Sequence, residues 1–254
     1  MIRIRKKFIL GFILAVGLLV TRDFFYEVPI ITYHQIKDVC PKDSLLCVTE
    51  KSFKKQMEFI FRYNYKVISP EELYLSLIRK KPIPKRAVLI SFDDGTDDFY
   101  KYAFKTLKEY KFPAVVFIIC DYINKEGYLH QKELKEIRNY NITIGSHTRT
   151  HRYLGDTYDE AILQEEIYGS KKILEEILGE KIYFLAYPLG GYNDKVKTIV
   201  KDAGYRLAFT TNRAGYKRNP DIFALRRIKM TEDSDNFFVL WPKLSGLYNL
   251  LRKG

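Results

Sequence analysis

Short, continuously apolar segments alternate along this chain with longer segments in which apolar residues recur at helical spacing. The short segments are rich in branched residues, which is typical of strands buried on both faces of a parallel sheet. We predict such strands at residues 28–33, 66–68, 87–92, 114–119, 142–146, 183–187, 207–210 and 224–228. Strands that alternate with helices predict an α/β fold. Seven or eight units within about 200 residues favour a distorted (β/α)7–8 barrel with parallel strands, and an open doubly wound sheet is the alternative.

Two capping boxes predict where helices begin. Residues 69–72, Ser-Pro-Glu-Glu, combine a capping box with proline at the first helical position and predict a helix that runs to about residue 79. Thr157 and Glu160 form a second box, which opens a long helix that Gly179 can end.

The N-terminus has the pattern of an export signal. Four basic residues lie between positions 3 and 7, and residues 8–20 are apolar without a charge. As a helix this segment would reach only about 20 Å, less than the roughly 30 Å hydrocarbon core of a bilayer. Because no small-residue cleavage site follows residue 20, we interpret residues 1–26 as a signal-anchor and short linker that hold the domain outside the cytoplasm. A cleaved signal, which would make the protein secreted, is the alternative.

The rest of the chain has enough apolar material for one domain. Of its 254 residues, 46% are hydrophobic and 15% aromatic, and barrels of this length are normally single domains. We expect this domain at residues 27–230 and an amphipathic tail at residues 231–254. The aromatic and basic residues of the tail suit either a helix that lies on a membrane or one that packs on the barrel.

The formal net charge of +12 arises partly at the N-terminus, and the other basic residues are interspersed with acidic ones. Such a surface is usually solvated, and it could favour anionic cell-surface polymers or lipid headgroups. No basic-aromatic recognition helix occurs in the sequence, so we expect no nucleic-acid partner.

The three cysteines divide into a pair and a single residue. Cys40 and Cys47 bracket a polar loop in which a short disulfide is feasible if the domain is exported into an oxidising compartment. Two free thiols are the alternative, because pairing cannot be deduced from sequence. Cys120 closes an apolar segment and is expected to be a buried packing residue.

Two adjacent carboxylates follow the predicted strand at residues 87–92. Asp93 and Asp94 precede Gly95, so they lie where the strand ends. Ligands bind at the carboxyl ends of parallel strands because the loops that leave them converge there. Adjacent residues of an extended chain point to opposite sides, so the two carboxylates are expected to differ in role. One could bind a cation while the other accepts a proton.

Two histidines follow the predicted strand at residues 142–146. His147 and His151 are four residues apart, a spacing that places two imidazoles on one side of a helical turn. The spacing alone would be explained better by two surface histidines in a polar loop. In combination with the paired carboxylates it favours a site for Zn²⁺ or a similar ion, which lowers the pKa of bound water to about 7.

These segments resemble the motifs of a known family. Residues 92–95, 146–151 and 187–190 are similar, in order and spacing, to the first three motifs of the polysaccharide deacetylases, which are carbohydrate esterase family 4 or NodB homology domains. The resemblance covers roughly residues 27–230. It implies that Asp93 is the general base and that a divalent metal is bound by Asp94, His147 and His151. Zn²⁺ is the expected ion, with Co²⁺, Ni²⁺ or Fe²⁺ as alternatives.

The chain departs from the family pattern at two positions. It has no histidine after His151, whereas most members have a catalytic histidine near the C-terminus. The branch that deacetylates poly-N-acetylglucosamine has an N-terminal Tyr-His instead, so the resemblance implies that His34 is the general acid. Ala186 stands where many members have an arginine that orients the base, and Arg226 or Arg227 could take over that task.

The third motif is expected to line the substrate pocket. Tyr187 and Pro188 would contact the acetyl group, and the Tyr187 backbone N–H could donate to the oxyanion. A packing role for this aromatic-proline turn is the alternative.

The sequence therefore predicts metal-dependent de-N-acetylation of N-acetylglucosamine units in an extracellular polysaccharide, with poly-β-1,6-N-acetylglucosamine of a biofilm matrix as the favoured substrate. Its partners would be this polymer and a membrane, contacted by the N-terminal segment and also by the C-terminal tail if that tail is interfacial. The alternatives are deacetylation of peptidoglycan or another amino-sugar glycoconjugate, and a glycan-binding protein without turnover. A two-carboxylate glycosidase fits less well, because adjacent carboxylates cannot readily flank a glycosidic bond at the roughly 5 Å or more that this chemistry uses.

Overall fold

The main sheet is entirely parallel and has the strand order β10-β9-β8-β7-β6-β5-β1-β11, with β4 beside β5. The computed structural model describes residues 27–212, 221–246 and 248, so the predicted N-terminal hydrophobic helix lies outside the described residues. The strands are β1 (Ile30–Tyr33), β4 (Lys66–Val67), β5 (Ala87–Phe92), β6 (Ala114–Ile118), β7 (Ile142–Ser146), β8 (Phe184–Ala186), β9 (Leu207–Thr210), β10 (Leu225–Arg226) and β11 (Ile228–Lys229).

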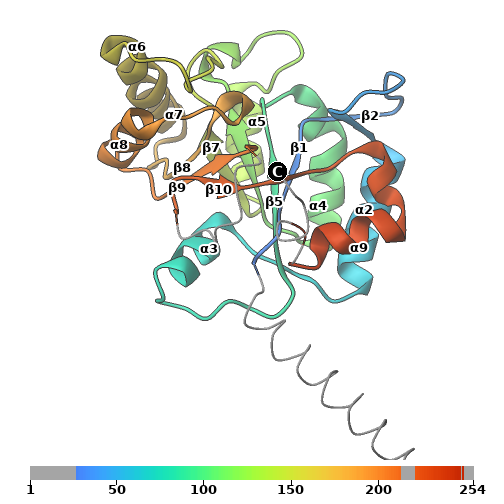
Figure 1. Cartoon of the computed structure of the whole chain (residues 1–254). Coiled ribbons are helices and arrows are strands. Elements are labelled where there is room, and N and C mark those ends of the chain that lie inside the picture. Colours follow the sequence, from blue (N-terminus) through green and yellow to red (C-terminus); the bar gives the residue numbers. More distant parts are fainter. Residues whose placement is uncertain (1–26, 213–220, 247, 249–254) are drawn as a thin grey trace, which may run out of the picture.

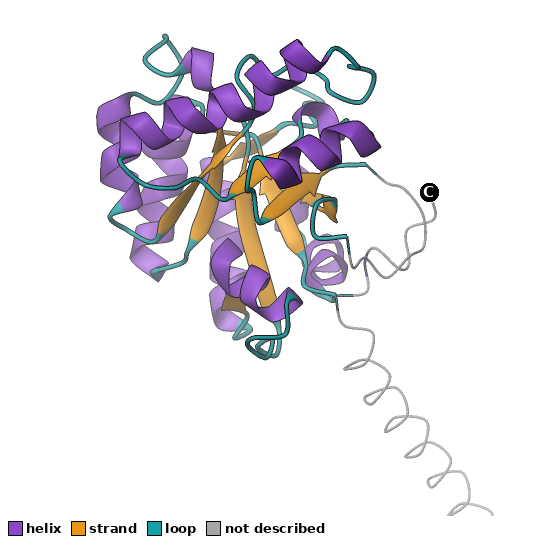
Figure 2. Cartoon of the chain, turned by 90° about the vertical axis from the view of Figure 1, so that its left-hand side faces the viewer, coloured by secondary structure: helices purple, strands orange, loops and turns teal. Residues whose placement is uncertain are grey.

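Helices surround this sheet, with the strands in the middle of the molecule (Figure 1, Figure 2). They are α2 (Glu50–Arg62), α3 (Pro70–Leu77), α4 (Phe104–Tyr110), α5 (Gln131–Arg138), α6 (Glu160–Gln164), α7 (Ser170–Leu178), α8 (Asp194–Asp202) and α9 (Phe237–Leu244). Short π-helical turns η1 (Phe99–Ala103) and η3 (Glu165–Gly169) and 3-10 turns η2 (Cys120–Tyr122), η4 (Pro188–Gly190) and η5 (Glu232–Asp235) complete the set. The predicted parallel α/β barrel is confirmed.

One continuous segment closes the barrel. β10 pairs with β9 at one edge of the sheet, and β11 pairs with β1 at the other. Arg227 lies between β10 and β11, and its N–H donates to the carbonyl of Thr210 on β9 at 3.0 Å. The single strand expected at residues 224–228 is therefore wrong, because the chain changes its pairing partner at Arg227 to bridge the two edges.

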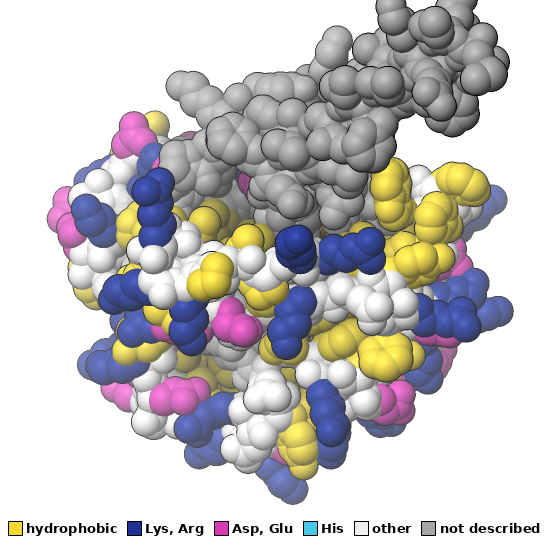
Figure 3. All heavy atoms as spheres, turned by 90° about the horizontal axis from the view of Figure 1, so that it is seen from below, with side chains coloured by type: hydrophobic (Ala, Val, Ile, Leu, Met, Phe, Trp, Pro, Cys, Tyr) yellow, Lys and Arg dark blue, Asp and Glu magenta, His cyan; other side chains and the backbone are white. Residues whose placement is uncertain are grey.

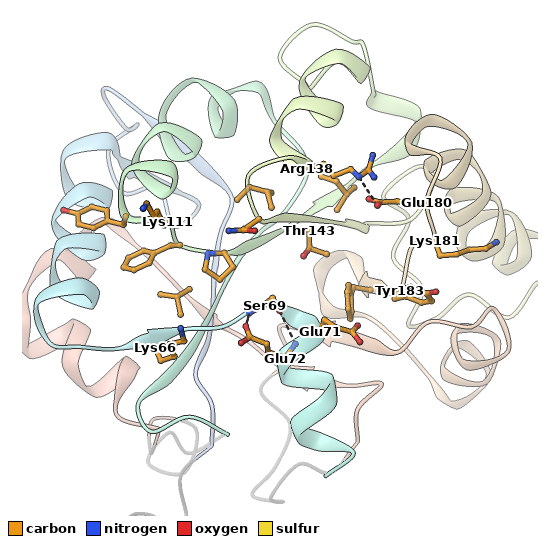
Figure 4. A pocket seen from close by; sticks show the side chains of 18 of the residues that line it. Lys66, Ser69, Glu71, Glu72, Lys111, Arg138, Thr143, Glu180, Lys181 and Tyr183 are labelled. Atoms are coloured by element: carbon orange, nitrogen blue, oxygen red, sulfur yellow. Dashed lines mark hydrogen bonds and ion pairs between the residues drawn. The ribbon is translucent and has the colours of Figure 1, made fainter. Parts of the chain in front are cut away.

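β4 and β6 share one edge of β5. β4 pairs with the first two residues of β5, whereas β6 pairs with the last two. β4 occupies this edge at the start of β5, so β6 can join only further along the strand. A cavity of about 800 Å³ lies at this end of the barrel, lined by Lys66, Lys111, Thr143 and Tyr183 among others (Figure 4). This cavity lies at the amino ends of the strands, away from the paired carboxylates.

The barrel interior is filled by apolar side chains from successive strands. The cluster includes Leu89, Val115, Phe117, Phe184, Leu207 and Phe209, whereas a larger cluster lies between the sheet and the helices. The Phe117 and Phe209 rings are 5.3 Å apart. Phe117 also lies so close to Gly145 of β7 that a Cβ on that glycine would be 2.5 Å from the ring. The interior is thus a packed core and not a channel.

The helix predicted from Thr157 begins later than expected. Asp159 is its N-cap, because its carboxylate accepts the N–H groups of Ala161 and Ile162, whereas the Thr157 hydroxyl donates to a loop carbonyl. α6, η3 and α7 then follow one another directly, and Gly179 ends the helix with a φ of 69°. The capping box at residues 69–72, in contrast, begins α3 as predicted.

A two-stranded ribbon of β2 (Gln35–Lys37) and β3 (Cys47–Thr49) lies outside the main sheet and was not predicted. Strands of three residues are too short for a clear alternating pattern. A Cys40–Cys47 disulfide joins the start of β3 to the loop before it, with a Cα–Cα distance of 5.6 Å. Of the two alternatives for this pair, the structure has the disulfide. Cys120 is a buried free thiol, as expected.

The C-terminal tail packs on the barrel through α9. Leu240 and Leu244 are buried, and the Phe237 ring lies 5.8 Å from Phe59 of α2. Phe238 and Trp241 point outward, with exposures of 82% and 51%. α9 therefore has one packed side and one exposed aromatic side. Within the described part of the chain, no helix combines the length and hydropathy that crossing a bilayer requires.

We expect Gly145→Ala to destabilise the fold by about 1–3 kcal/mol, the usual cost of overpacking a core. The added methyl would lie 2.5 Å from the Phe117 ring and 3.0 Å from the Phe184 carbonyl oxygen, so both would have to shift. Thermal unfolding followed by circular dichroism measures the effect, at about 2–4 °C per kcal/mol for a domain of this size. Thr143→Ala, at a half-buried position of the same strand, is the control. An unchanged melting temperature for Gly145→Ala would contradict this packing.

Candidate active site

The paired carboxylates lie where β5 ends. The Asp93 N–H donates to the Tyr33 carbonyl at 3.0 Å, which continues the pairing of β5 with β1 by one residue. Asp94 then has a φ of 72° and Gly95 a φ of 68°. A left-handed conformation costs a non-glycine residue about 1–3 kcal/mol. This turn directs the two side chains differently, as the sequence indicated.

Asp93 is buried against Arg227. The guanidinium donates to both carboxylate oxygens, at 2.5 and 2.7 Å, and both side chains are almost fully buried. Burial alone would raise the pKa of Asp93, but the charges of Arg227, His147 and His34 and the hydrogen bond from Arg227 outweigh it and hold this pKa well below its usual range. The pairing keeps Asp93 ionised and fixes its orientation.

Arg227, and not Arg226, is thus the arginine beside Asp93. Arg227 also donates to the Thr32 hydroxyl at 3.2 Å. Arg226 instead lines a neighbouring pocket of about 420 Å³ together with Arg227 and Lys229. Neighbouring residues of an extended chain point to opposite sides, so only one of the two arginines can enter the barrel.

Asp94 forms a three-residue cluster with His147 and His151. Its Oδ1 atom lies 3.5 Å from the Nε2 atom of each histidine, and the ligand atoms all lie within 4.8 Å of one another. Tetrahedral ligands at metal bonds of about 2.0–2.1 Å would be roughly 3.3 Å apart, so this donor set fits a first-row divalent ion. Asp94 Oδ1 is buried without a hydrogen-bond partner. A cation would satisfy it.

The charges around Asp94 support the same interpretation. Burial, followed by the negative charge of Asp93, raises the pKa of Asp94 to about 7. Burial lowers the pKa of His147 to about 4 and also lowers that of His151. Neutral imidazoles are the form that binds a metal, and a bound cation would restore the ionised form of Asp94.

The two histidines converge through a loop. Residues 147–151 contain no helix, and Thr148 and His151 have φ values of 65° and 67°. The expected helical turn is therefore wrong, although the two imidazoles do face one ion site. His147 Nδ1 donates to the Ala186 carbonyl at 2.8 Å, which leaves its Nε2 atom free to face Asp94.

His34 also lies close to Asp93. It follows β1, and its Nε2 atom is 3.8 Å from Asp93 Oδ2. Burial lowers the pKa of His34, and the Asp93 carboxylate partly offsets this effect. Its Nδ1 atom is buried without a hydrogen-bond partner. His130, the remaining histidine, is exposed at the start of α5, and its backbone N–H donates to Glu133.

The expected roles of Tyr187 and Pro188 conflict with their positions. The Tyr187 N–H donates to the Phe209 carbonyl at 2.9 Å, so it is not available to an oxyanion. Its side chain is fully buried, stacks on Tyr192 and donates to the Phe223 carbonyl. Pro188 is also buried. The packing role is therefore the better description of this turn.

Two residues of this site escaped the sequence analysis. Thr32 accepts from Arg227, and Glu166 accepts from the backbone of the histidine loop. Thr32 belongs to an apolar strand, and Glu166 follows Glu165 in a helical segment where such a pair of acidic residues resembles a solvated face. Neither position carries a motif that would distinguish it.

We expect Arg227→Gln to raise the pKa of Asp93 and to lower the stability at neutral pH by about 3–5 kcal/mol, because a buried carboxylate would lose its partner. In the wild type the depressed pKa contributes stability above the unfolded-state pKa, and this contribution is lost as the pH falls through the folded-state pKa. In the variant, stability should instead rise as the pH falls below the raised pKa. Carboxyl-carbon NMR titration and denaturant unfolding measure both effects.

Arg226→Gln is the matched control for that substitution, because Arg226 is adjacent in sequence and lines the neighbouring pocket. It should leave the pKa of Asp93 where it is. A similar pKa of Asp93 in Arg227→Gln and in the wild type would contradict the pairing.

Comparison with known proteins places this site in a family. The sequence matches the polysaccharide deacetylase family over residues 80–208. It is 30% identical over 205 residues to YxkH of Bacillus subtilis (strain 168), covering 81% of this chain and 72% of that protein. It is 27% identical over 200 residues to the poly-beta-1,6-N-acetyl-D-glucosamine N-deacetylase of Staphylococcus aureus (strain MRSA252), covering 74% of this chain and 69% of that protein.

Two solved structures resemble the fold. The Streptococcus pyogenes deacetylase PplD has a TM-score of 0.79 and 27% identity, covering 85% of this chain and 97% of that chain. IcaB from Ammonifex degensii has a TM-score of 0.74 and 25% identity, covering 86% and 97%. The chain therefore belongs to the polysaccharide deacetylase family and is a hydrolase of N-acetyl amide bonds.

Proposed function

We propose that this deacetylase is metal-dependent and removes acetyl groups from N-acetylglucosamine units of an extracellular polysaccharide, with poly-β-1,6-N-acetylglucosamine as the favoured polymer. The observation that carries the proposal is the grouping of Asp93, His34 and the cluster of Asp94, His147 and His151 at one end of the barrel. The choice of polymer is supported by the similarity to the Staphylococcus aureus enzyme and by His34, which takes the place of the absent C-terminal histidine.

Asp94, His147 and His151 would hold the ion, and Zn²⁺ suits two imidazoles and one carboxylate. When bound, such an ion polarises a carbonyl group and lowers the pKa of water to about 7. The residues around it supply the proton transfers, one as the base and another as the acid.

Asp93 is the proposed general base. Arg227 keeps it ionised and fixes its orientation through both carboxylate oxygens, so it can accept the proton of the attacking water. His34 is the proposed general acid, because an amine leaves readily only when its nitrogen is protonated. Burial lowers the pKa of His34, and the nearby Asp93 carboxylate partly offsets this effect by favouring the protonated form. Water thus adds a hydroxyl to the acetyl carbon and a proton to the amine, and acetate and the free amine are released.

A binding protein without turnover is less consistent with this site, because the proposed base and ligand residues occur together. Deacetylation of peptidoglycan or of another amino-sugar glycoconjugate would use the same residues. The choice between these substrates therefore depends on the assay below.

We also propose that the domain is exported and tethered to the membrane by residues 1–26. The described chain begins at Glu27, whose N–H donates to the Gly246 carbonyl just beyond α9 at 3.2 Å. β1 then runs from this end of the barrel towards His34, so the described chain begins at the end of the barrel opposite to the site. The part of this end that Figure 3 leaves uncovered carries Lys and Arg side chains with hydrophobic and some acidic ones between them. Basic and hydrophobic side chains of this kind suit an anionic membrane surface.

We expect the full-length protein, loaded with Zn²⁺ in detergent, to release acetate from a poly-β-1,6-N-acetylglucosamine oligomer. A chelator should abolish the release, and readdition of Zn²⁺ should restore it. Acetate is measured by a coupled assay. Absence of acetate from this oligomer, with release from peptidoglycan or chitin oligomers, would overturn the choice of polymer. Absence from all three would favour the binding protein.

Asp93→Asn and His34→Ala should each lower kcat by about 10²–10⁴-fold, the usual contribution of a positioned acid or base. His130→Ala is the matched control, because this histidine is exposed and lies at the start of α5. It should retain wild-type activity. Full activity of His34→Ala would show that another group supplies the proton.

For the tether, the full-length chain should sediment with membranes after expression in a bacterial host, and a chain that begins at Glu27 should not. Protease added to intact spheroplasts should digest the domain. Release of the full-length domain into the medium would instead indicate that the signal is cleaved.

A further inference from the structure

We propose that Glu166 is a positioning residue for the metal site, acting through the loop that carries both histidines. This inference rests on the proposed metal site and adds to it a residue that lies outside the three sequence motifs. The physical basis is a buried carboxylate that binds the backbone of the strained loop on which the metal ligands lie.

The Glu166 carboxylate has three partners, all in the loop between the two histidines. Its Oε2 atom accepts the N–H groups of Arg149 and Thr150, at 3.0 and 2.9 Å. Its Oε1 atom accepts the Thr150 hydroxyl at 2.5 Å. Glu166 is only 4% exposed. Hydrogen bonds to an ionised acceptor in such surroundings are stronger than those between neutral groups.

These bonds hold backbone that would otherwise relax. Thr148 and His151, on either side of the two donors, both have positive φ values, and such conformations persist only where the surroundings hold them. The Thr148 carbonyl accepts the Cys120 N–H and the Arg149 carbonyl accepts the Asp121 N–H, which ties the first half of the loop to η2. Glu166 is the corresponding anchor of the second half, which leads directly into His151.

The π-helical turn η3 explains why a helix can supply this anchor. A π turn contains one residue more than an α-helical turn, so it changes which side chains face a neighbouring segment. Here the adjacent residues Glu165 and Glu166 both reach the loop. Glu165 pairs with the Arg149 side chain, while Glu166 binds the backbone. Gly169 lies beside Glu165, where a Cβ would be 2.8 Å from its carboxylate oxygen.

The consequence for the metal is preorganisation. If Glu166 is removed, the N–H groups of Arg149 and Thr150 lose their acceptor. His151 keeps the bond from its N–H to the Thr148 hydroxyl, but the loop before it is held less firmly at the geometry that faces Asp94. Residues that support ligands in this way typically change metal affinity about 10–100-fold when mutated. We expect a loss of this size for Glu166→Ala.

The test measures Zn²⁺ affinity of the full-length, metal-free protein by competition with a chromophoric chelator, and the absorption spectrum of the Co²⁺ form. Glu166→Ala should bind Zn²⁺ about 10–100-fold more weakly and should have an altered Co²⁺ spectrum. Glu166→Gln should recover part of the affinity. The amide oxygen can accept both N–H groups, and the Thr150 hydroxyl can turn to accept from the amide nitrogen.

Glu165→Ala is the matched control, because it removes a carboxylate from the same turn but leaves the backbone bonds in place. It should leave affinity and spectrum unchanged. If Glu166→Ala does not fold, Glu166→Gln and Thr150→Val test the proposal in its place. Each should weaken Zn²⁺ binding, by a smaller factor than the one expected for Glu166→Ala.

Wild-type affinity and an unaltered Co²⁺ spectrum in the folded Glu166 variants would overturn the proposal, even if their melting temperatures fall. Both readouts use the metal alone. A wild type that binds Zn²⁺ but releases no acetate would therefore refute the proposed function and leave this inference standing, whereas a wild type without Zn²⁺ binding would refute both.

Discussion

The structure depends on the ion pair between Arg227 and Asp93, which joins barrel closure to the chemistry of the site. Arg227 occupies the position at which one segment stops pairing with β9 and begins to pair with β1. Its side chain pairs with Asp93, which follows β5 and is 134 residues away in the sequence. Neither charge would be tolerated at this depth alone. The fold can therefore bury the ionised carboxylate of Asp93 only if the guanidinium of Arg227 is buried beside it.

Backbone conformation, in addition to charge, determines where the side chains of the site lie. Asp94, Thr148 and His151 all have positive φ values, so two of the three candidate ligand residues and the residue after His147 are in a conformation that non-glycine residues avoid. The disposition of the ligands thus comes from loops held by the surrounding sheet and helices. This explains why the site needs supporting contacts from β8, η2 and η3.

Much of the fold could be predicted from the sequence, because its signals are local. The strands β5, β7 and β9 have the predicted bounds, since each is a short apolar run that ends at a polar residue or turn. The candidate ligand residues could be named because they follow such strands. The helical turn at His147 was wrong, because four-residue spacing also fits a loop with positive φ angles. The choice between Arg226 and Arg227, the split of the last strand and the role of Glu166 depend on contacts between distant segments, which no local pattern records.

The π-helical turn also bears on how this region can be compared between relatives. η3 holds one residue beyond what an α-helix needs to cover the same length, and α6 and α7 continue on either side of it without a break. A protein with one residue fewer here would form a regular helix, and every side chain after the deletion would rotate by about 100° relative to those before it. It could keep the packing of α7 or the carboxylate under the histidine loop, but not both. A single-residue gap in an alignment at this point would therefore mark a change in how the loop is supported, and not a neutral difference in length.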